Sequence, residues 1–162
     1  ELHRLAGDRS KALADIEAAL AISRETGMAF IGPVILGVLA LATEDGGVRG
    51  TALAEGEALL AAGSVSHNHF LFRRDAIDAC LQMGAWDAAE RHAGALEDYA
   101  REEPSPWSRF VVGRGRALAA HGRGAGTATL GTELARLRSE GLLLQHLDAL
   151  GAIDVALGEL RG

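Results

Sequence analysis

The stretch that decides the fold is residues 84–99, which read GAWDAAERHAGALEDY. A turn glycine comes first, and apolar or small side chains then recur at positions 86, 89, 93, 96 and 100. This spacing of three and four residues places one stripe on one face of a helix. Asp87 and Glu90 lie near its start and Arg101 near its end, as the helix dipole favours. We therefore predict an amphipathic helix here and interpret it as the second helix of a helical hairpin.

The same pattern recurs along the chain, with a glycine followed five residues later by a small residue. The four glycines are Gly7, Gly47, Gly84 and Gly122, spaced 40, 37 and 38 residues apart. The small residues are Ala12, Ala52, Ala89 and Thr127. Each glycine follows one apolar helical segment and precedes another, so each repeat is expected to form helix, turn, helix. The sequence therefore predicts an all-α protein, an α-solenoid of about four helical hairpins in a single domain over residues 1–162.

We place the four repeats at about 1–27, 28–63, 64–103 and 104–140, followed by a C-terminal capping helix at 141–161. The expected helices of the first three repeats include about 10–25, 30–43, 51–62 and 67–82, with a turn at 43–50. Leu2, Leu5 and Ala6 are expected to end a helix in a truncated first repeat. The capping helix is expected to be long and amphipathic, because terminal repeats must cover an apolar end. Its apolar residues are Leu143, Leu147, Leu150, Ile153 and Leu157.

Composition limits the classes of function. Apolar residues make up 48% of the chain and aromatic residues 4%, which favours a folded core of small aliphatic side chains. The net charge is −6 and no basic block occurs, which argues against a nucleic-acid partner because phosphate neutralisation dominates such binding. Cys80 is the only cysteine, so no intrachain disulfide can form and a cytoplasmic location is expected.

The most apolar segment is 28–42. It is shorter than the roughly 18 residues that a spanning helix needs and is interrupted by Gly32-Pro33, so a buried helix is predicted and no membrane segment. A homodimer through this segment stays open. Because the chain begins at Glu1 without a basic and apolar leader or an initiator methionine, we expect no signal peptide and a fragment of a larger protein.

The residues that follow the repeat glycines resemble a known family. Two sets carry the pattern, Gly7, Ala12, Ile16 and Ala19, then Gly84, Ala89, Ala93 and Leu96, and the first-helix positions Leu36-Gly37 and Gly115 fit it as well. This arrangement resembles the tetratricopeptide repeat (TPR), and it implies TPR-like hairpins whose first helices line a concave face. The spacing exceeds the family's period of about 34 residues, and the family's first-helix Trp and Tyr and closing Pro are missing. These departures indicate degenerate, lengthened repeats.

Several separated strings resemble a narrower group. They are VSHNHF at 65–70, WDAAER at 86–91, LEDY at 96–99, EPSPW at 103–107 and RGRAL at 114–118. These strings are similar to the C-terminal repeat region of large bacterial signalling proteins, in which a class III adenylate or guanylate cyclase domain and a P-loop ATPase domain precede the repeats. The resemblance implies a regulatory module of such a protein, while neither the cyclase nor the ATPase domain lies in this chain.

Two features invite a chemical role and are interpreted as structural. His67-Asn68-His69 holds two histidines two positions apart, which point away from each other on a helix, so helix capping and packing are favoured over a metal site. The segments 113–116 and 122–126 are rich in glycine but lack the lysine and hydroxyl residue of a phosphate-binding loop. We therefore predict no catalytic residue, no cofactor and no metal, and the chain is not expected to be an enzyme.

The candidate functional surface is a groove lined by the first helix of each repeat. The predicted groove residues are Ile31, Val34, Val38, Arg74, Asp78, Gln82, Arg109, Val112 and Arg116. An apolar end followed by an arginine-rich end fits an acidic and apolar peptide segment, because guanidinium groups make forked contacts with carboxylates. The alternative interpretation is that these charges belong to solvated helix faces.

Two functions of different classes follow from this surface. The first is a non-catalytic scaffold that binds a protein or peptide, including other domains of the same polypeptide, in a multidomain bacterial signalling protein. The second is the effector-sensing repeat domain of an ATP-dependent transcription regulator, with a small molecule bound between helices. A cyclase domain upstream would favour the first, and a C-terminal helix-turn-helix would favour the second.

Overall fold

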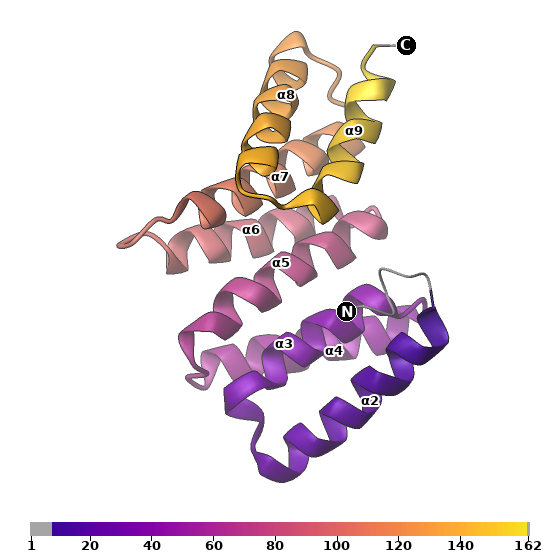
Figure 1. The fold of residues 1–162 in the computed structure, drawn as a ribbon, viewed down its shortest axis with the longest axis vertical. Helices are drawn as coiled ribbons and strands as arrows, with labels where there is room; N and C mark the ends of the chain where they lie inside the picture. Colours follow the sequence, from indigo (N-terminus) through magenta and orange to yellow (C-terminus); the bar gives the residue numbers. More distant parts are fainter. Residues whose placement is uncertain (1–7, 162) are drawn as a thin grey trace. The chain divides into compact units, whose positions relative to one another are not determined.

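The computed structural model describes residues 8–161, and 82% of the structure is helical with no strand among the described residues. The predicted all-α class is confirmed. The helices, labelled as in Figure 1, are α2 (Arg9–Thr26), α3 (Met28–Ala42), α4 (Gly46–Ala61), α5 (Ser66–Gln82), α6 (Trp86–Tyr99), α7 (Pro106–Gly122), α8 (Ala128–Leu143), the short 3-10 helix η1 (Leu147–Ala149) and α9 (Leu150–Glu159). The helix end predicted at Leu2, Leu5 and Ala6 lies outside the described residues.

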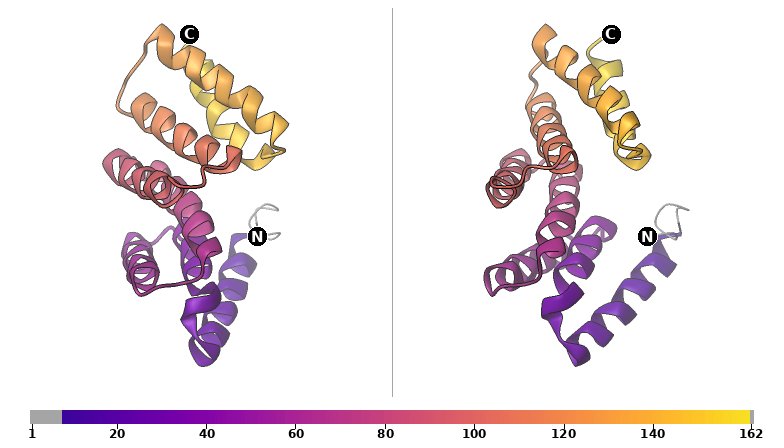
Figure 2. Two further views of the ribbon diagram at one scale, coloured as in Figure 1. Left: turned by 90° about the vertical axis from the view of Figure 1, so that its left-hand side faces the viewer. Right: turned by 60° about the vertical axis from the view of Figure 1, so that its left-hand side comes forward.

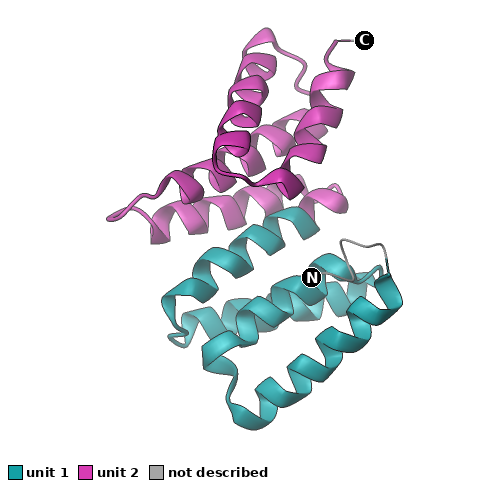
Figure 3. Ribbon diagram, viewed as in Figure 1, with its two compact units in different colours: residues 1–79 teal, residues 80–162 magenta. Residues whose placement is uncertain are grey.

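The chain divides into two compact units, residues 1–79 and 80–162, with the boundary inside α5 (Figure 3). In unit 1, α2 packs against α3, and α3 packs against α4 (Figure 2). In unit 2, α6 packs against α7, and α7 contacts both α8 and α9. None of the helices in residues 8–161 combines the length and the hydropathy that crossing a membrane requires.

The core of unit 1 depends on a close contact between α4 and α5. Phe72 is fully buried, and a Cβ placed on Gly56 would lie 2.2 Å from the Phe72 ring. Only a residue without a side chain fits under this ring, which explains a glycine in the middle of a helix despite its low helix propensity. The neighbouring aliphatic cluster contains Leu20, Leu36, Ala40, Leu41, Ala52 and Ala79.

The apolar helix α3 receives its polar contacts from other helices. Pro33 lies inside α3 and has no N–H, so the carbonyl of Ala29 lacks its usual helical donor. The fully buried Asn68 side chain of α5 donates to this carbonyl at 3.1 Å and to that of Phe30 at 3.0 Å. Asn68 therefore supplies the hydrogen bond that the proline removes.

The C-terminal end of α3 is closed in a similar way by α4. Arg49 is buried, and its Nε donates to the carbonyl of Ala40 at 2.7 Å while its guanidinium also contacts the carbonyl of Thr43. A cation at this end also fits the helix dipole. The helix α4 itself starts at Gly46, because Asp45 accepts hydrogen bonds from the first backbone N–H groups of that helix. The turn predicted at 43–50 is therefore much shorter than expected.

Unit 2 is organised around α7. Its buried residues include Phe110, Val111, Val112 and Leu118, and they meet Leu134 and Leu137 of α8 and Ile153 of α9 in the same core. The helix begins with a capping box in which the Ser105 and Ser108 side chains each bond the other residue's backbone N–H. Pro106 occupies the first helical position, as predicted.

The glycines used to align the repeats do not occupy equivalent positions. Gly84 has φ +68° in the turn after α5, and its structural counterpart after α7 is Gly124, with φ +88°. Gly122 instead ends α7, and a Cβ there would lie 2.5 Å from the Trp86 ring; Gly47 lies in the first turn of α4. The predicted common role of Gly47, Gly84 and Gly122 is therefore wrong, because one glycine permits a positive φ and another permits close packing.

The long helix predicted at 141–161 is also wrong. Gly141 lies inside α8, which ends at Leu143, and α9 begins only at Leu150. Between them Gln145 has φ +58°, and the backbone N–H of His146 bonds the carbonyl of Gly141 at 2.9 Å. This arrangement is a helix-terminating motif of the Schellman type, normally made with glycine.

Candidate functional site

The predicted groove residues of unit 1 lie on α3 and α5. Ile31, Val34 and Val38 are half-buried along α3. Arg74 is half-buried on α5 and its Nε donates to the carboxylate of Asp75 at 2.8 Å, while Asp78 is half-buried one turn further along. The Asp75 side chain is only 2% exposed, so Arg74 compensates a buried charge of its own helix. This contact points to a structural role for Arg74.

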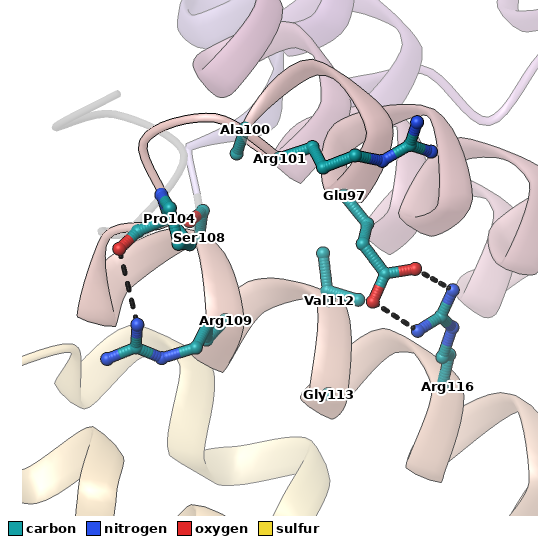
Figure 4. A pocket seen from close by; sticks show the side chains of 9 residues that line it. All are labelled: Glu97, Ala100, Arg101, Pro104, Ser108, Arg109, Val112, Gly113 and Arg116. Atoms are coloured by element: carbon teal, nitrogen blue, oxygen red, sulfur yellow. Dashed lines mark hydrogen bonds and ion pairs between the residues drawn. The ribbon is translucent and has the colours of Figure 1, made fainter.

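In unit 2 three of the predicted residues meet at one pocket. Arg109, Val112 and Arg116 line a pocket of about 380 Å³ between α6 and α7 (Figure 4). The remaining lining residues are Glu97, Ala100, Arg101, Pro104, Ser108 and Gly113. Gln82, also predicted for the groove, is exposed at the end of α5 and is not among them.

Helix geometry explains why these three α7 residues act together. Positions 109, 112 and 116 follow the three- and four-residue spacing that keeps side chains on one helix face. The opposite wall comes from the last turn of α6 and from the connection that Pro104 and the Ser105 capping box hold at the start of α7. Val112 lies between the two arginines in Figure 4 and presents an apolar surface to the pocket.

One end of the pocket is closed by an ion pair. The Arg116 guanidinium donates through two nitrogens to the two oxygens of Glu97, at 2.9 Å and 2.7 Å. These hydrogen bonds hold the pKa of Glu97 below its usual value and raise the pKa of Arg116. Both side chains are therefore charged at neutral pH, in the forked geometry that guanidinium and carboxylate groups prefer.

The other end of the pocket carries an arginine without a carboxylate partner among residues 8–161. Arg109 donates only to the backbone carbonyl of Pro104, at 3.2 Å, and its side chain is exposed (Figure 4). Arg101, at the upper rim in that view, pairs with Asp98 outside the pocket. A guanidinium carries five N–H donors, so Arg109 keeps most of its capacity for an anionic ligand.

Glu97, Arg101, Pro104 and Ser108 were not predicted as site residues. Their positions near the end of one helix and the start of the next show only that the segments are adjacent in sequence. Glu97 and Arg116 are 19 residues apart and on different helices, so their pairing depends on how α6 packs against α7. The sequence signal that was available is the pair of prolines at 104 and 106, which indicates a tight connection between the two helices.

A second, shallower pocket of about 470 Å³ lies around Trp86 and Arg123. The Arg123 guanidinium donates to Asp87 at 2.6 Å and to Glu90 at 2.9 Å. Its cation is therefore engaged by two carboxylates. The pocket at Arg109 is the better candidate for a ligand, because it combines an apolar surface with an arginine that has no acidic partner in the described part of the chain.

The His67-Asn68-His69 cluster takes part in packing. Asn68 bonds to α3 as described, and the His67 ring meets Phe30 edge to face with 5.7 Å between ring centroids. This agrees with the predicted capping and packing role, although Asn68 serves α3 rather than its own helix. Burial lowers the pKa of His69, and the nearby Arg73 lowers it further. No cluster of three or more metal-binding side chains occurs within residues 8–161.

The glycine-rich segments lie in or beside helices. Gly113 and Gly115 are both within α7, and Gly113 faces the pocket. Gly122 and Gly124 belong to the end of α7 and to the turn after it. In comparisons with models of protein families, with curated proteins and with solved structures, this chain found no match.

Proposed function

We propose that this chain is a non-catalytic, TPR-like α-solenoid that binds a partner protein through the pocket formed by α6 and α7. The observation that carries the proposal is the pocket itself, where Val112 provides an apolar contact between Arg109 and Arg116. The consecutive packing of neighbouring helices within each unit is consistent with helical repeats. On the resemblance given above, the module belongs to a multidomain bacterial signalling protein with cyclase and ATPase domains, and its partner includes other domains of that polypeptide.

The chemistry of the pocket selects an acidic segment with an apolar residue beside the acid. The carboxylate would bind Arg109, whose donors are largely unused among the described contacts. The apolar side chain would lie over Val112, one helical turn away. Helices and their connection supply a preformed surface, so binding needs no chemistry and little rearrangement.

A short acidic peptide tests this proposal directly. The probe is acetyl-Asn-Ala-Val-Asp-amide, titrated into the isotope-labelled protein and followed by backbone amide NMR shifts. We expect the amides around Ser108 and Val112 to shift, with an affinity of about 1 mM or better, since one charged contact and one small apolar contact are involved. Arg109→Met should weaken this binding about tenfold by removing the cation while it keeps an apolar stem.

The matched control is Arg138→Met, which removes a different exposed arginine. Arg138 lies on α8 and donates to Asp154 of α9 at 2.5 Å. If the two variants weakened binding equally, or if the amides around the pocket did not move, the pocket would not be the binding site.

A second candidate function has one observation in its favour. The pocket volume of about 380 Å³ falls in the range of small-molecule sites, roughly 300–1,000 Å³. An effector-sensing domain of an ATP-dependent transcription regulator would bind a small carboxylic acid there. A thermal-shift screen of metabolites separates the two functions, because a ligand at a hundredfold excess over its Kd would stabilise the protein by about 2.7 kcal/mol.

A further inference from the structure

The pocket contains two sites of the same chemistry on one face of α7. Arg109 and Arg116 are seven residues apart, which places their Cα atoms about 10 Å apart along the helix. Val112 lies between them (Figure 4). Both guanidinium groups can therefore be reached by one ligand that lies along α7.

The two sites differ in occupancy. Arg116 already holds a carboxylate in a two-point contact, that of Glu97, whereas Arg109 donates only to the Pro104 carbonyl among the described residues. The Glu97 carboxylate thus shows which ligand group fits the Arg116 site and how it is oriented. This occupant comes from the protein's own α6.

The ion pair that fills the second site is exposed enough to exchange. The side chains of Arg116 and Glu97 keep 40% and 54% of their accessible surface. Exposed ion pairs contribute little net free energy, because water solvates the separated charges well. A carboxylate delivered by a ligand already held at Arg109 would have a high effective concentration at Arg116, which favours replacement of Glu97.

We propose that Glu97 is an internal competitor at the second of two carboxylate sites, and that the partner is an extended peptide whose two acidic residues, three positions apart, bind Arg109 and Arg116. This inference rests on the proposed function and extends it. An extended chain advances about 3.3–3.6 Å per residue, so acidic residues three positions apart span the same distance of about 10 Å. The intervening residues would lie over Val112.

Two peptides and one substitution test the inference. The probes are acetyl-Asp-Ala-Val-Asp-amide, with two acids, and acetyl-Asn-Ala-Val-Asp-amide, with one. In the wild-type protein Glu97 blocks the second site, so the two peptides should bind within about threefold of each other. Glu97→Gln should strengthen binding of the two-acid peptide by about tenfold, or about 1.4 kcal/mol, and change binding of the one-acid peptide by less than about threefold.

Two controls separate site occupancy from a general change in charge. Glu90→Gln removes the same charge from the same helix and breaks a comparable ion pair, that with Arg123. It should give no preference for the two-acid peptide. Adding Arg116→Met to Glu97→Gln should abolish the preference, because the second site then has no cation.

The outcomes distinguish this inference from the function on which it rests. If the one-acid peptide binds in an Arg109-dependent manner but Glu97→Gln creates no preference beyond that of Glu90→Gln, the competitor role is refuted and the proposed function survives. If neither peptide binds the wild-type protein or Glu97→Gln, both proposals are refuted. If the preference remains without Arg116, the assignment of the second site is wrong.

Discussion

Arginines and their partners differ in kind between the two units. In unit 1, Arg49 is buried and bonds backbone carbonyls of α3, and Arg73 is buried and pairs with Glu57 of α4. In unit 2, Arg109 and Arg116 lie at the rim of a pocket and contact a loop carbonyl or an exposed carboxylate. The same residue type therefore stabilises the chain in one place and presents a binding surface in the other, and burial decides which.

The reason for the difference lies in the composition of the helices. The helix α3 contains fifteen residues without a polar side chain and is interrupted by Pro33, so its free carbonyls must be satisfied from outside. Asn68 and Arg49 perform that role. The helices α6 and α7 have regular ends, a capping box and polar faces of their own, so their arginines are not needed for backbone contacts.

The largest expected effect is at Asn68. Asn68→Ala should destabilise the protein by about 2–3 kcal/mol, since two buried carbonyls lose their donor in an apolar environment. The measurement is urea unfolding followed by far-UV circular dichroism. A double-mutant cycle with Pro33→Ala identifies the cause, because an alanine in place of the proline would restore the backbone N–H that bonds the carbonyl of Ala29. The cost of losing Asn68 should then fall by about 1 kcal/mol, and an unchanged cost would show that Asn68 does not replace the missing N–H.

The next effect compares one arginine from each unit. Arg49→Met should destabilise the protein by about 2 kcal/mol, because buried hydrogen bonds to backbone carbonyls are lost. Arg116→Met should cost less than about 1 kcal/mol, as expected for an exposed ion pair. Both values come from the same urea experiment. Equal losses at the two positions would remove the distinction between structural and surface arginines.

A smaller effect is expected at the helix end that was missed. Gln145 has φ +58°, a conformation that costs a residue with a Cβ about 1–2 kcal/mol, whereas glycine adopts it freely but loses more entropy on folding. Gln145→Gly should therefore stabilise the protein by about 0.5 kcal/mol. Gln145→Ala is the control and should not stabilise it. The midpoint of thermal unfolding measures both, and a lower midpoint for the glycine variant would contradict the strain argument.

The smallest expected effect is a pH dependence that belongs to unit 1. Burial and the Arg73 charge lower the pKa of His69 in the folded protein, so the folded state favours the neutral ring. As the pH falls below about 6.5, the unfolded chain takes up this proton first, and stability decreases until the folded-state pKa is passed. The urea midpoint should therefore fall between pH values of about 7.5 and 5.5. His69→Gln should reduce that slope, and an unchanged slope would exclude His69 as its source.

Prediction from sequence succeeded where local rules act alone. The amphipathic stripe of 84–99 located α6, and Pro106 marked the start of α7, because helix periodicity and caps depend on neighbours in the chain. It failed at Gly122 and at 141–161. A glycine in a sequence does not reveal whether it permits a positive φ or makes room for a ring from another helix, and at Gly122 the ring is Trp86.

For the candidate site, the sequence by itself determined that Arg109, Val112 and Arg116 share one face of a helix, because that follows from spacing along α7. Only the tertiary structure decided that Glu97 closes one end of this face and leaves Arg109 without an acidic partner in the described chain. It also decided that Asn68 reaches α3, 39 residues earlier in the chain. Such pairings depend on which helices pack together, and the free energy of packing is a property of whole surfaces rather than of neighbouring residues.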